Sequence, residues 1–281
     1  MKLLVEADTK IMLVISDKEM GCCMKIPKHV DVVRHAFTLQ ADSYAVNPLL
    51  LDSRRLTRLV EAVNPSEDSR VLDVATGPGF VAEVFSPVCR TIVGIDITLS
   101  PLEIAKQRLR GLSNLTLQLA DVSRLPFSKA VFDVVVSRLA LHHMEYPAQV
   151  LEEMARVCRA DGVVAIEDII VSEHSKRANF QNRFEKLRDP SHTKAQPLSR
   201  LLKMFADVGL EVENVIIGFL MQDVETWLAN AHAPASQARR ARALIERDAN
   251  EDLSGTQPFH DSNNRIHFRQ RTAIVVGRKL L

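Results

Sequence analysis

An apolar run that leads into a glycine turn constrains the fold of this chain more than any other feature. Residues 71–80 read VLDVATGPGF, and a second apolar run, residues 91–95, ends at Asp96. Consecutive apolar positions followed by glycines predict a buried strand that turns directly into a helix. Glycines let the backbone approach a ligand closely, and an acid after the second strand accepts hydrogen bonds from ribose hydroxyls. The sequence therefore predicts an adenosine-binding site.

Two kinds of adenosine compound fit this pattern. Residues 77–82, GPGFVA, satisfy the glycine spacing of dinucleotide-binding folds, so a nicotinamide or flavin enzyme is one interpretation. Asp73, four residues before the first glycine, is placed to accept the amine of an amino-acid ligand. Asp121 ends a third apolar run, and Ser137 lies in a fourth, residues 131–143. Strand ends with these side chains favour a ligand that joins an amino acid, a ribose and an adenine.

Five motifs between residues 70 and 170 extend this pattern: VLDVATGPGF, VGIDIT, LADVSRLPF, FDVVVSRLALHHM and LEEMARVCRADGVVAIED. In order and spacing they resemble the class I S-adenosylmethionine-dependent methyltransferases, and the nearest group is the ubiquinone and menaquinone C-methyltransferases. Residues 37–44 resemble the short pattern that precedes the core in this family. One departure is residues 159–162, Arg-Ala-Asp-Gly, where the family usually has lysine, proline and two glycines.

The resemblance and the alternation of strands and helices imply an α/β fold. We expect a doubly wound, seven-stranded, mostly parallel sheet, whose last strand, near residues 272–277, runs antiparallel beside the fifth. The expected organisation, by residue range, is an N-terminal extension over 1–27, a cofactor-binding core with a helical segment over 28–171, helical cap insertions around the sixth strand over 172–270, and the last core strand over 271–281.

The resemblance implies S-adenosylmethionine as the cofactor and assigns roles to the strand-end acids. Asp96 is expected to bind the ribose, Asp73 the amino group of the methionine part, and Asp121 the adenine amino group. Helix capping is the alternative role for Asp73 and Asp121, and core packing is the alternative for Tyr44. The full set expected to bind the cofactor is Tyr44, Asp73, Thr76, Gly77, Gly79, Asp96, Ile97, Asp121, Val122, Ser137 and Arg138.

The reaction implied is methyl transfer to a small organic acceptor, at oxygen, carbon or nitrogen. His143 and His192 are the candidate catalytic bases, because the unperturbed pKa of an imidazole lies near neutrality. His142 is expected to have a structural role. No metal site is expected, since His142 and His143 are adjacent rather than four residues apart. A nicotinamide-dependent oxidoreductase and a non-catalytic S-adenosylmethionine-binding protein are the alternatives.

Charge and composition narrow the range of partners. The 36 basic and 35 acidic side chains nearly cancel, so we expect no nucleic-acid partner. No apolar run approaches the roughly 20 residues of a membrane span, and acids interrupt the N-terminus too early for a signal peptide. The cysteines lack metal-ligand spacing and are expected to be free thiols of a cytoplasmic protein; they are Cys22, Cys23, Cys89 and Cys158.

Overall fold

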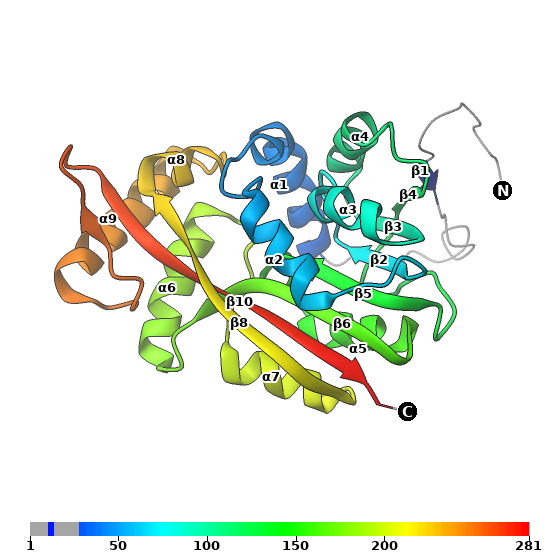
Figure 1. The fold of residues 1–281 in the computed structure, drawn as a ribbon. Coiled ribbons are helices and arrows are strands. Elements are labelled where there is room, and N and C mark those ends of the chain that lie inside the picture. The colour runs from blue at the N-terminus through cyan, green and yellow to red at the C-terminus, as the bar shows by residue number, and fades with distance from the viewer. Residues whose placement is uncertain (1–10, 14–27, 281) are drawn as a thin grey trace.

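A single twisted sheet runs through the molecule (Figure 1). The computed structural model describes residues 11–13 and 28–280. The long strands lie in the order β4 (Leu115–Leu119), β3 (Thr91–Asp96), β2 (Arg70–Val74), β5 (Phe132–Arg138), β6 (Cys158–Val171), β10 (Ile266–Lys279) and β8 (Leu210–Asp223).

The direction of the strands agrees with the sequence-based prediction. Strands β2 to β6 are mutually parallel, whereas β10 runs antiparallel to β6 on one side and to β8 on the other. Thr272 pairs with Ile169 in this arrangement, so the predicted position of the last strand beside the fifth is confirmed. Three short strands add to the sheet: β1 (Ile11–Leu13) pairs with β4, β7 (Gln196–Pro197) with β6, and β9 (Phe259–His260) with β10.

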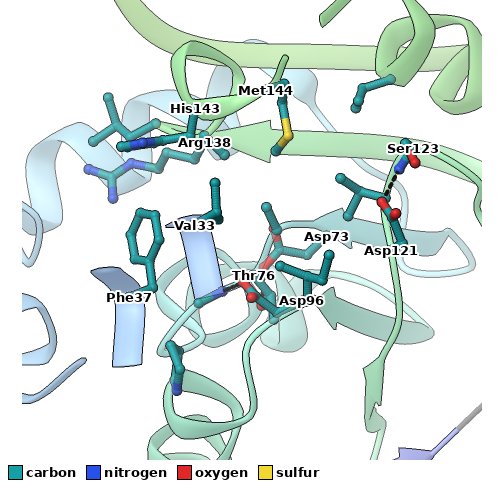
Figure 2. Close-up of a pocket in the computed structure, with 18 of the residues that line it drawn as sticks. Val33, Phe37, Asp73, Thr76, Asp96, Asp121, Ser123, Arg138, His143 and Met144 are labelled. Carbon is teal, nitrogen blue, oxygen red and sulfur yellow. Dashed lines mark hydrogen bonds between the residues drawn. The ribbon is translucent and has the colours of Figure 1, made fainter. Parts of the chain in front are cut away.

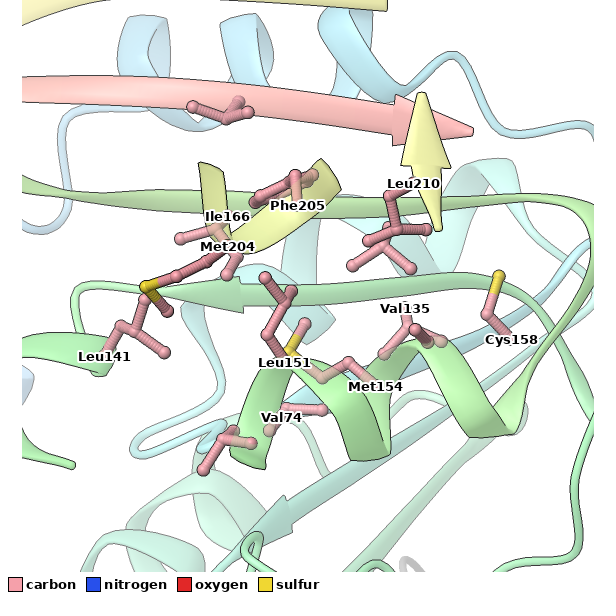
Figure 3. Close-up of a cluster of buried hydrophobic side chains, with 14 of the residues drawn as sticks. Val74, Val135, Leu141, Leu151, Met154, Cys158, Ile166, Met204, Phe205 and Leu210 are labelled. Carbon is pink, nitrogen blue, oxygen red and sulfur yellow. The ribbon is translucent and has the colours of Figure 1, made fainter. Parts of the chain in front are cut away.

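Helices cover both faces of the sheet because its central strands are apolar on both faces. One face packs against α2 (Ser53–Val63), α3 (Phe80–Phe85) and α4 (Leu99–Arg108). The other packs against α5 (Pro147–Val157) and α7 (Leu198–Asp207), which supply buried residues such as Leu151, Met154 and Phe205 (Figure 3). Short 3-10 turns, η1 (Ser86–Val88) and η2 (Leu141–His143), follow α3 and β5.

The helical segment expected over residues 29–63 is two helices. The first, α1 (Lys28–Ala45), ends before a turn at Asn47, and Asp52 caps the first turn of α2 by accepting a hydrogen bond from the backbone of Arg54. Asn64, in the left-handed conformation, ends α2 just before Pro65. The break between the helices allows α1 to leave the face of the sheet and lie beside the carboxyl ends of the strands.

Part of the segment 172–270 forms a helical unit, here called the cap. Helices α6 (Ser175–Arg188), α8 (Val224–Ala229) and α9 (Ala235–Glu251) enclose a small core of their own, in which the Trp227 ring packs edge-on against Phe184 and Phe268 at 6.0 and 5.1 Å. By contrast, α7 belongs to the main core, and β10 begins at Ile266 rather than at 271. Figure 1 shows the cap at one end of the sheet, around the ends of β8 and β10.

Other predictions fall partly outside the described residues. Within the expected extension, residues 11–13 form β1, and Cys22 and Cys23 lie outside the described residues. Cys89 and Cys158 are buried free thiols. No helix in the described part of the chain is long and apolar enough to cross a membrane. Among the same residues, no three His, Cys, Asp or Glu side chains are grouped to hold a metal ion.

Candidate functional site

A cavity of about 350 Å³ lies beyond the carboxyl ends of β2, β3, β4 and β5. This is the edge where parallel α/β sheets bind ligands, and the volume is typical of a ligand pocket. Figure 2 shows α1 with Phe37 on one side of the cavity and Asp121 on the other. Arg138 and His143 lie opposite Asp73 of β2 and Asp96 of β3. The expected cofactor-binding residues that line the cavity are Tyr44, Asp73, Thr76, Gly77, Asp96, Ile97, Asp121, Val122 and Arg138.

The glycine turn after β2 has a backbone that few side chains tolerate. Gly77 has φ +52° and Gly79 has φ +83°. Gly79 does not line the cavity; a Cβ atom there would lie 2.5 Å from Leu109 Cδ1, so glycine is needed for the close approach of α4. Ala75 and Leu139, at the ends of β2 and β5, also have positive φ. Such strained residues cluster at binding sites, and these two line the cavity.

Asp96 is held rigidly at the end of β3. Its Oδ2 accepts a hydrogen bond from the Gly77 N–H and its Oδ1 accepts one from the Thr98 N–H, both at 2.9 Å. Burial raises the pKa of this carboxyl, and the backbone donors oppose the shift. Each carboxylate oxygen has a further lone pair, so the fixed side chain can still accept hydrogen bonds from a ligand's hydroxyls.

Asp121 occupies the corresponding place after β4. The side chain is exposed at the rim of the cavity, and its Oδ1 accepts a hydrogen bond from the Ser123 N–H at 2.8 Å. Ile97 and Val122, which follow Asp96 and Asp121 in the chain, supply apolar surface to the same cavity. An acid beside two apolar side chains is the combination that an adenine ring and its amino group require.

Asp73 and Arg138 line the cavity, and each has one buried polar atom without a hydrogen-bond partner among the described residues. The Thr76 hydroxyl donates to Asp73 Oδ2 at 2.5 Å, while Asp73 Oδ1 has no hydrogen-bond partner among the described residues. Arg138 donates from Nε to Glu167 Oε2 at 2.7 Å and from Nη1 to the Leu50 carbonyl at 3.2 Å, and its Nη2 is likewise unpaired there. Buried polar atoms without partners are rare and costly.

The two residues have opposite charge, and both line one cavity. Burial raises the pKa of Asp73 from 3.8 to about 7, and the charge of Arg138 opposes that shift. An amino-acid ligand would supply both missing partners, because its ammonium suits Asp73 and its carboxylate suits Arg138. The residues present therefore fit the amino-acid end of S-adenosylmethionine.

Glu167 supports this arrangement, and sequence reasoning did not find it. Its carboxylate is buried between the guanidinium groups of Arg138 and Arg55. Arg55 Nη1 also donates to the Phe219 carbonyl at 3.0 Å, so the cluster connects α2, β5, β6 and β8. A charged Glu-Asp pair at the end of an otherwise apolar run, residues 163–168, is the sequence signal that would have shown it.

The three neighbouring histidines have different environments. His142 is bonded through Nδ1 to Asp168 Oδ1 at 2.5 Å, and its backbone N–H donates to the same carboxylate. His143 lines the cavity, with its Nδ1 2.9 Å from Ser191 Oγ. His192 does not line the cavity, and its Nε2 is 2.8 Å from Asn182 Oδ1. The structure therefore brings only His143 of the two candidate bases to the site.

Two other expected residues have partly structural positions. Tyr44 lines the cavity and stacks on Phe80 with 6.2 Å between ring centroids; burial raises the pKa of its hydroxyl to about 12, so the ring is neutral. Ser137 does not line the cavity, because its hydroxyl donates to the Val74 carbonyl at 2.9 Å and joins β5 to β2.

One face of α1 forms a wall of the cavity, within the helix around Phe37 to Tyr44 that the sequence predicts beside the acceptor. Val33, Phe37 and Ala41 recur every four residues and line the cavity with Tyr44. This spacing is that of one helix face, and it is the signal that predicts the wall. Met144 and Gln149, on the opposite side, also line the cavity and carried no such signal.

Known proteins share both this sequence pattern and this fold. Residues 72–166 match the family described as the methyltransferase domain. YcgJ of Bacillus subtilis, named an uncharacterized methyltransferase, is 27% identical over 206 residues, which is 73% of this chain and 81% of YcgJ. The crystal structure of a putative methyltransferase from Bacillus halodurans C-125 is similar at a TM-score of 0.76 and 26% identity, over 81% of this chain and 100% of that one.

The sheet order, the antiparallel β10 and the matched domain are those of a class I S-adenosylmethionine-dependent methyltransferase, and they support this class for the chain. Its cofactor is S-adenosylmethionine. Within the class it resembles the ubiquinone/menaquinone biosynthesis C-methyltransferases; that of Geotalea uraniireducens is 32% identical over 113 residues, 38% of this chain and 48% of the relative.

Proposed function

We propose that the chain transfers the methyl group of S-adenosylmethionine to a small, largely apolar organic acceptor that enters the cavity between α1 and η2. The observation that carries this proposal is the pair of oppositely charged residues, Asp73 and Arg138, that line one cavity, each with a buried polar atom left unpaired among the described residues. Asp96 and Asp121 follow on the next two strand ends, in the order that an amino acid, a ribose and an adenine require.

This orientation separates a cofactor side of the cavity from an acceptor side. Ile97 and Val122 would hold the adenine, Asp96 the ribose, and Asp73 and Arg138 the methionine part. The wall left for the acceptor contains Val33, Phe37, His143 and Met144, and it is mostly apolar. The bound cofactor supplies an activated methyl group, and the chain aligns the acceptor with it and keeps water out.

Alignment is the main contribution that these residues make. Acceptor atom and methyl carbon must approach to about 3–3.5 Å in line, and such positioning contributes ~7–11 kcal/mol to lowering a barrier. Rigid surroundings suit this role, since Arg138 is fixed by Glu167 and Phe37 packs edge-on against His143 at 4.9 Å between centroids.

The apolar acceptor wall and the resemblance to ubiquinone/menaquinone C-methyltransferases both support an apolar ring compound as the acceptor. Methylation at oxygen, carbon or nitrogen is compatible with this wall. The cytoplasmic location and the absence of a nucleic-acid partner stay predictions from the sequence.

The nicotinamide alternative fits the structure poorly. The five parallel strands have the order of a dinucleotide-binding sheet, but the antiparallel β10 lies beside the fifth, where those enzymes have a sixth parallel strand. A dinucleotide also has no free amino-acid end to pair with Asp73 and Arg138. A non-catalytic S-adenosylmethionine-binding protein would have the same cofactor site, so only an assay of methyl transfer distinguishes it from an enzyme.

The test is an acceptor screen with methyl-labelled S-adenosylmethionine, including quinol precursors and phenols. We expect label transfer to at least one apolar ring compound, and loss of transfer in Asp96→Ala. Cofactor binding without transfer to any acceptor supports the non-catalytic alternative. Quenching or enhancement of nicotinamide fluorescence at micromolar protein, without S-adenosylhomocysteine binding, overturns the proposal.

A further inference from the structure

His143 is the end of a buried chain of hydrogen bonds that begins at Asp189. Asp189 Oδ1 accepts from the Ser191 N–H at 2.8 Å and from the Ser191 hydroxyl at 2.6 Å. Ser191 Oγ in turn lies 2.9 Å from His143 Nδ1. All three side chains are buried, and Ser191 has no exposed surface. The chain joins the segment after α6 to η2, beside the acceptor wall.

The protons in this chain can be assigned from its charges. The Asp189 carboxylate accepts two hydrogen bonds from Ser191 and lies 3.9 Å from the Arg188 guanidinium, and both favour its ionised form. The ionised carboxylate only accepts hydrogen bonds. Ser191 must therefore donate its hydroxyl proton to Asp189 and accept a hydrogen bond from His143 Nδ1–H.

This assignment leaves the second ring nitrogen of His143 unprotonated. Burial, followed by the charge of neighbouring His142, lowers the pKa of His143 to about 3, so the ring is neutral near pH 7. A neutral imidazole with a proton on Nδ1 has a lone pair on Nε2. Nε2 makes no hydrogen bond within the described residues, and His143 lines both the main cavity and a second cavity of about 60 Å³ beside the cap.

We propose that Ser191 and Asp189 are positioning residues that hold His143 in the Nδ1–H tautomer, so that Nε2 accepts a hydrogen bond from a hydroxyl or N–H group of the methyl acceptor. The inference rests on the proposed function and narrows its substrate class to ring compounds with such a donor near the methylated atom. A base as weak as this His143 orients the donor and does not retain its proton.

The tautomer can be measured in the full chain without any acceptor. Long-range proton–nitrogen NMR of the histidine rings, with S-adenosylhomocysteine present and with His143 assigned from His143→Gln, is expected to show Nδ1–H and a bare Nε2. Ser191→Ala is expected to shift His143 toward the Nε2–H tautomer. An Nε2–H ring in the wild type, or an unchanged ring in Ser191→Ala, overturns the inference.

Ser254→Ala is the matched control. Ser254 also donates its hydroxyl to a buried aspartate, Asp248, but this pair lies in the cap and lines neither cavity. Its loss should leave the His143 signals unchanged while removing a hydrogen bond of the same kind. If Ser254→Ala moves the His143 signals as much as Ser191→Ala does, the effect is general loosening and the positioning role is refuted.

Phenol and toluene test the hydrogen bond itself, because they share a shape and differ in the donor. We expect phenol to shift the His143 Nε2 signal and to bind about fivefold tighter than toluene, the value of one neutral hydrogen bond. Ser191→Ala should remove that preference. Equal shifts from both probes, or none from either, contradict the inference. Failure of S-adenosylhomocysteine to bind contradicts the proposed function instead, because the tautomer of His143 does not depend on cofactor binding.

Discussion

The two sides of the cavity are built from the chain in different ways. The acids of the cofactor side come from β2, β3, β4 and the turns that follow them, so that Asp73, Asp96 and Asp121 lie within one continuous stretch of about fifty residues, and Arg138 follows at the end of β5. The acceptor side joins α1, η2 and the segment after α6, which are far apart in sequence. The residues of the cofactor side can therefore be found from a local sequence pattern, whereas the acceptor wall depends on packing between distant segments.

This difference predicts that substitutions on the two sides affect separate quantities. Changes on the cofactor side should weaken binding of S-adenosylhomocysteine, and changes on the acceptor side should leave it intact. The comparison fails if both sides contribute equally to cofactor affinity.

The largest effect is expected for Asp96→Ala. The variant loses hydrogen bonds to two ribose hydroxyls and also frees the Gly77 and Thr98 N–H groups. At ~1.5 kcal/mol for each charged bond, affinity for S-adenosylhomocysteine should fall about a hundredfold. Calorimetry measures this. The control is Asp133→Ala, which removes a carboxylate bonded to the Arg70 N–H at the amino end of β5, away from the site; equal losses in both variants would refute the ribose assignment.

Arg138→Met should weaken the same ligand by roughly tenfold or more, because one charge-assisted hydrogen bond to its carboxylate is worth ~1.5–3 kcal/mol. Arg55→Met is the matched comparison. Arg55 pairs with the same Glu167 but does not line the cavity. Affinities measured for both should separate a ligand contact from simple loss of the ion cluster. If Arg55→Met weakens binding as much as Arg138→Met, Arg138 does not bind the ligand carboxylate.

Cofactor affinity should rise with pH because of Asp73. Its pKa of about 7 lies above the ordinary 3.8, so the folded apo protein holds a proton that the unfolded chain releases, and this group makes the apo protein less stable as pH rises from 4 to 7. An ammonium ligand needs the ionised form, whose fraction grows about fivefold between pH 6 and pH 7. Titrations at both values should show that gain, and Asp73→Asn should abolish it. A flat wild-type profile contradicts the assignment.

The smallest effect on cofactor affinity is expected for Phe37→Ala. Phe37 lines the acceptor wall and packs against His143 and Tyr44. Its removal should change S-adenosylhomocysteine affinity by less than about twofold, while raising the KM of whichever acceptor the screen identifies, because apolar contact area is lost. A tenfold loss of cofactor affinity in this variant would erase the distinction between the two sides.

The residues that the sequence predicts for the cofactor side carry local signals, and most of them line the cavity. Strand ends, glycines and acids of β2 to β4 stand in chain order, and the antiparallel β10 followed from the family pattern. Gly79 and Ser137 were assigned to the ligand, but neither lines the cavity; Gly79 lies against Leu109 at the end of α4, and Ser137 joins β5 to β2. Local spacing does not distinguish a residue that touches a ligand from its neighbour that supports the turn.

The acceptor side was predicted less well because no local pattern encodes it. His192 looked equivalent to His143 as a base, yet it bonds Asn182 outside the cavity, whereas Ser191, its neighbour, reaches His143 across 48 residues. The buried Glu167 likewise depends on arginines from two other elements. Such contacts are fixed only when distant segments pack together.

The central claim is that one cavity holds the cofactor with its amino-acid end between Asp73 and Arg138. A crystal structure of the full chain with S-adenosylhomocysteine tests it directly. We expect the ligand ammonium at Asp73 Oδ1, the carboxylate at Arg138 Nη2, the ribose at Asp96, and the sulfur turned toward Phe37 and His143. A ligand bound in the reverse direction, or one whose carboxylate does not contact Arg138, would contradict the account.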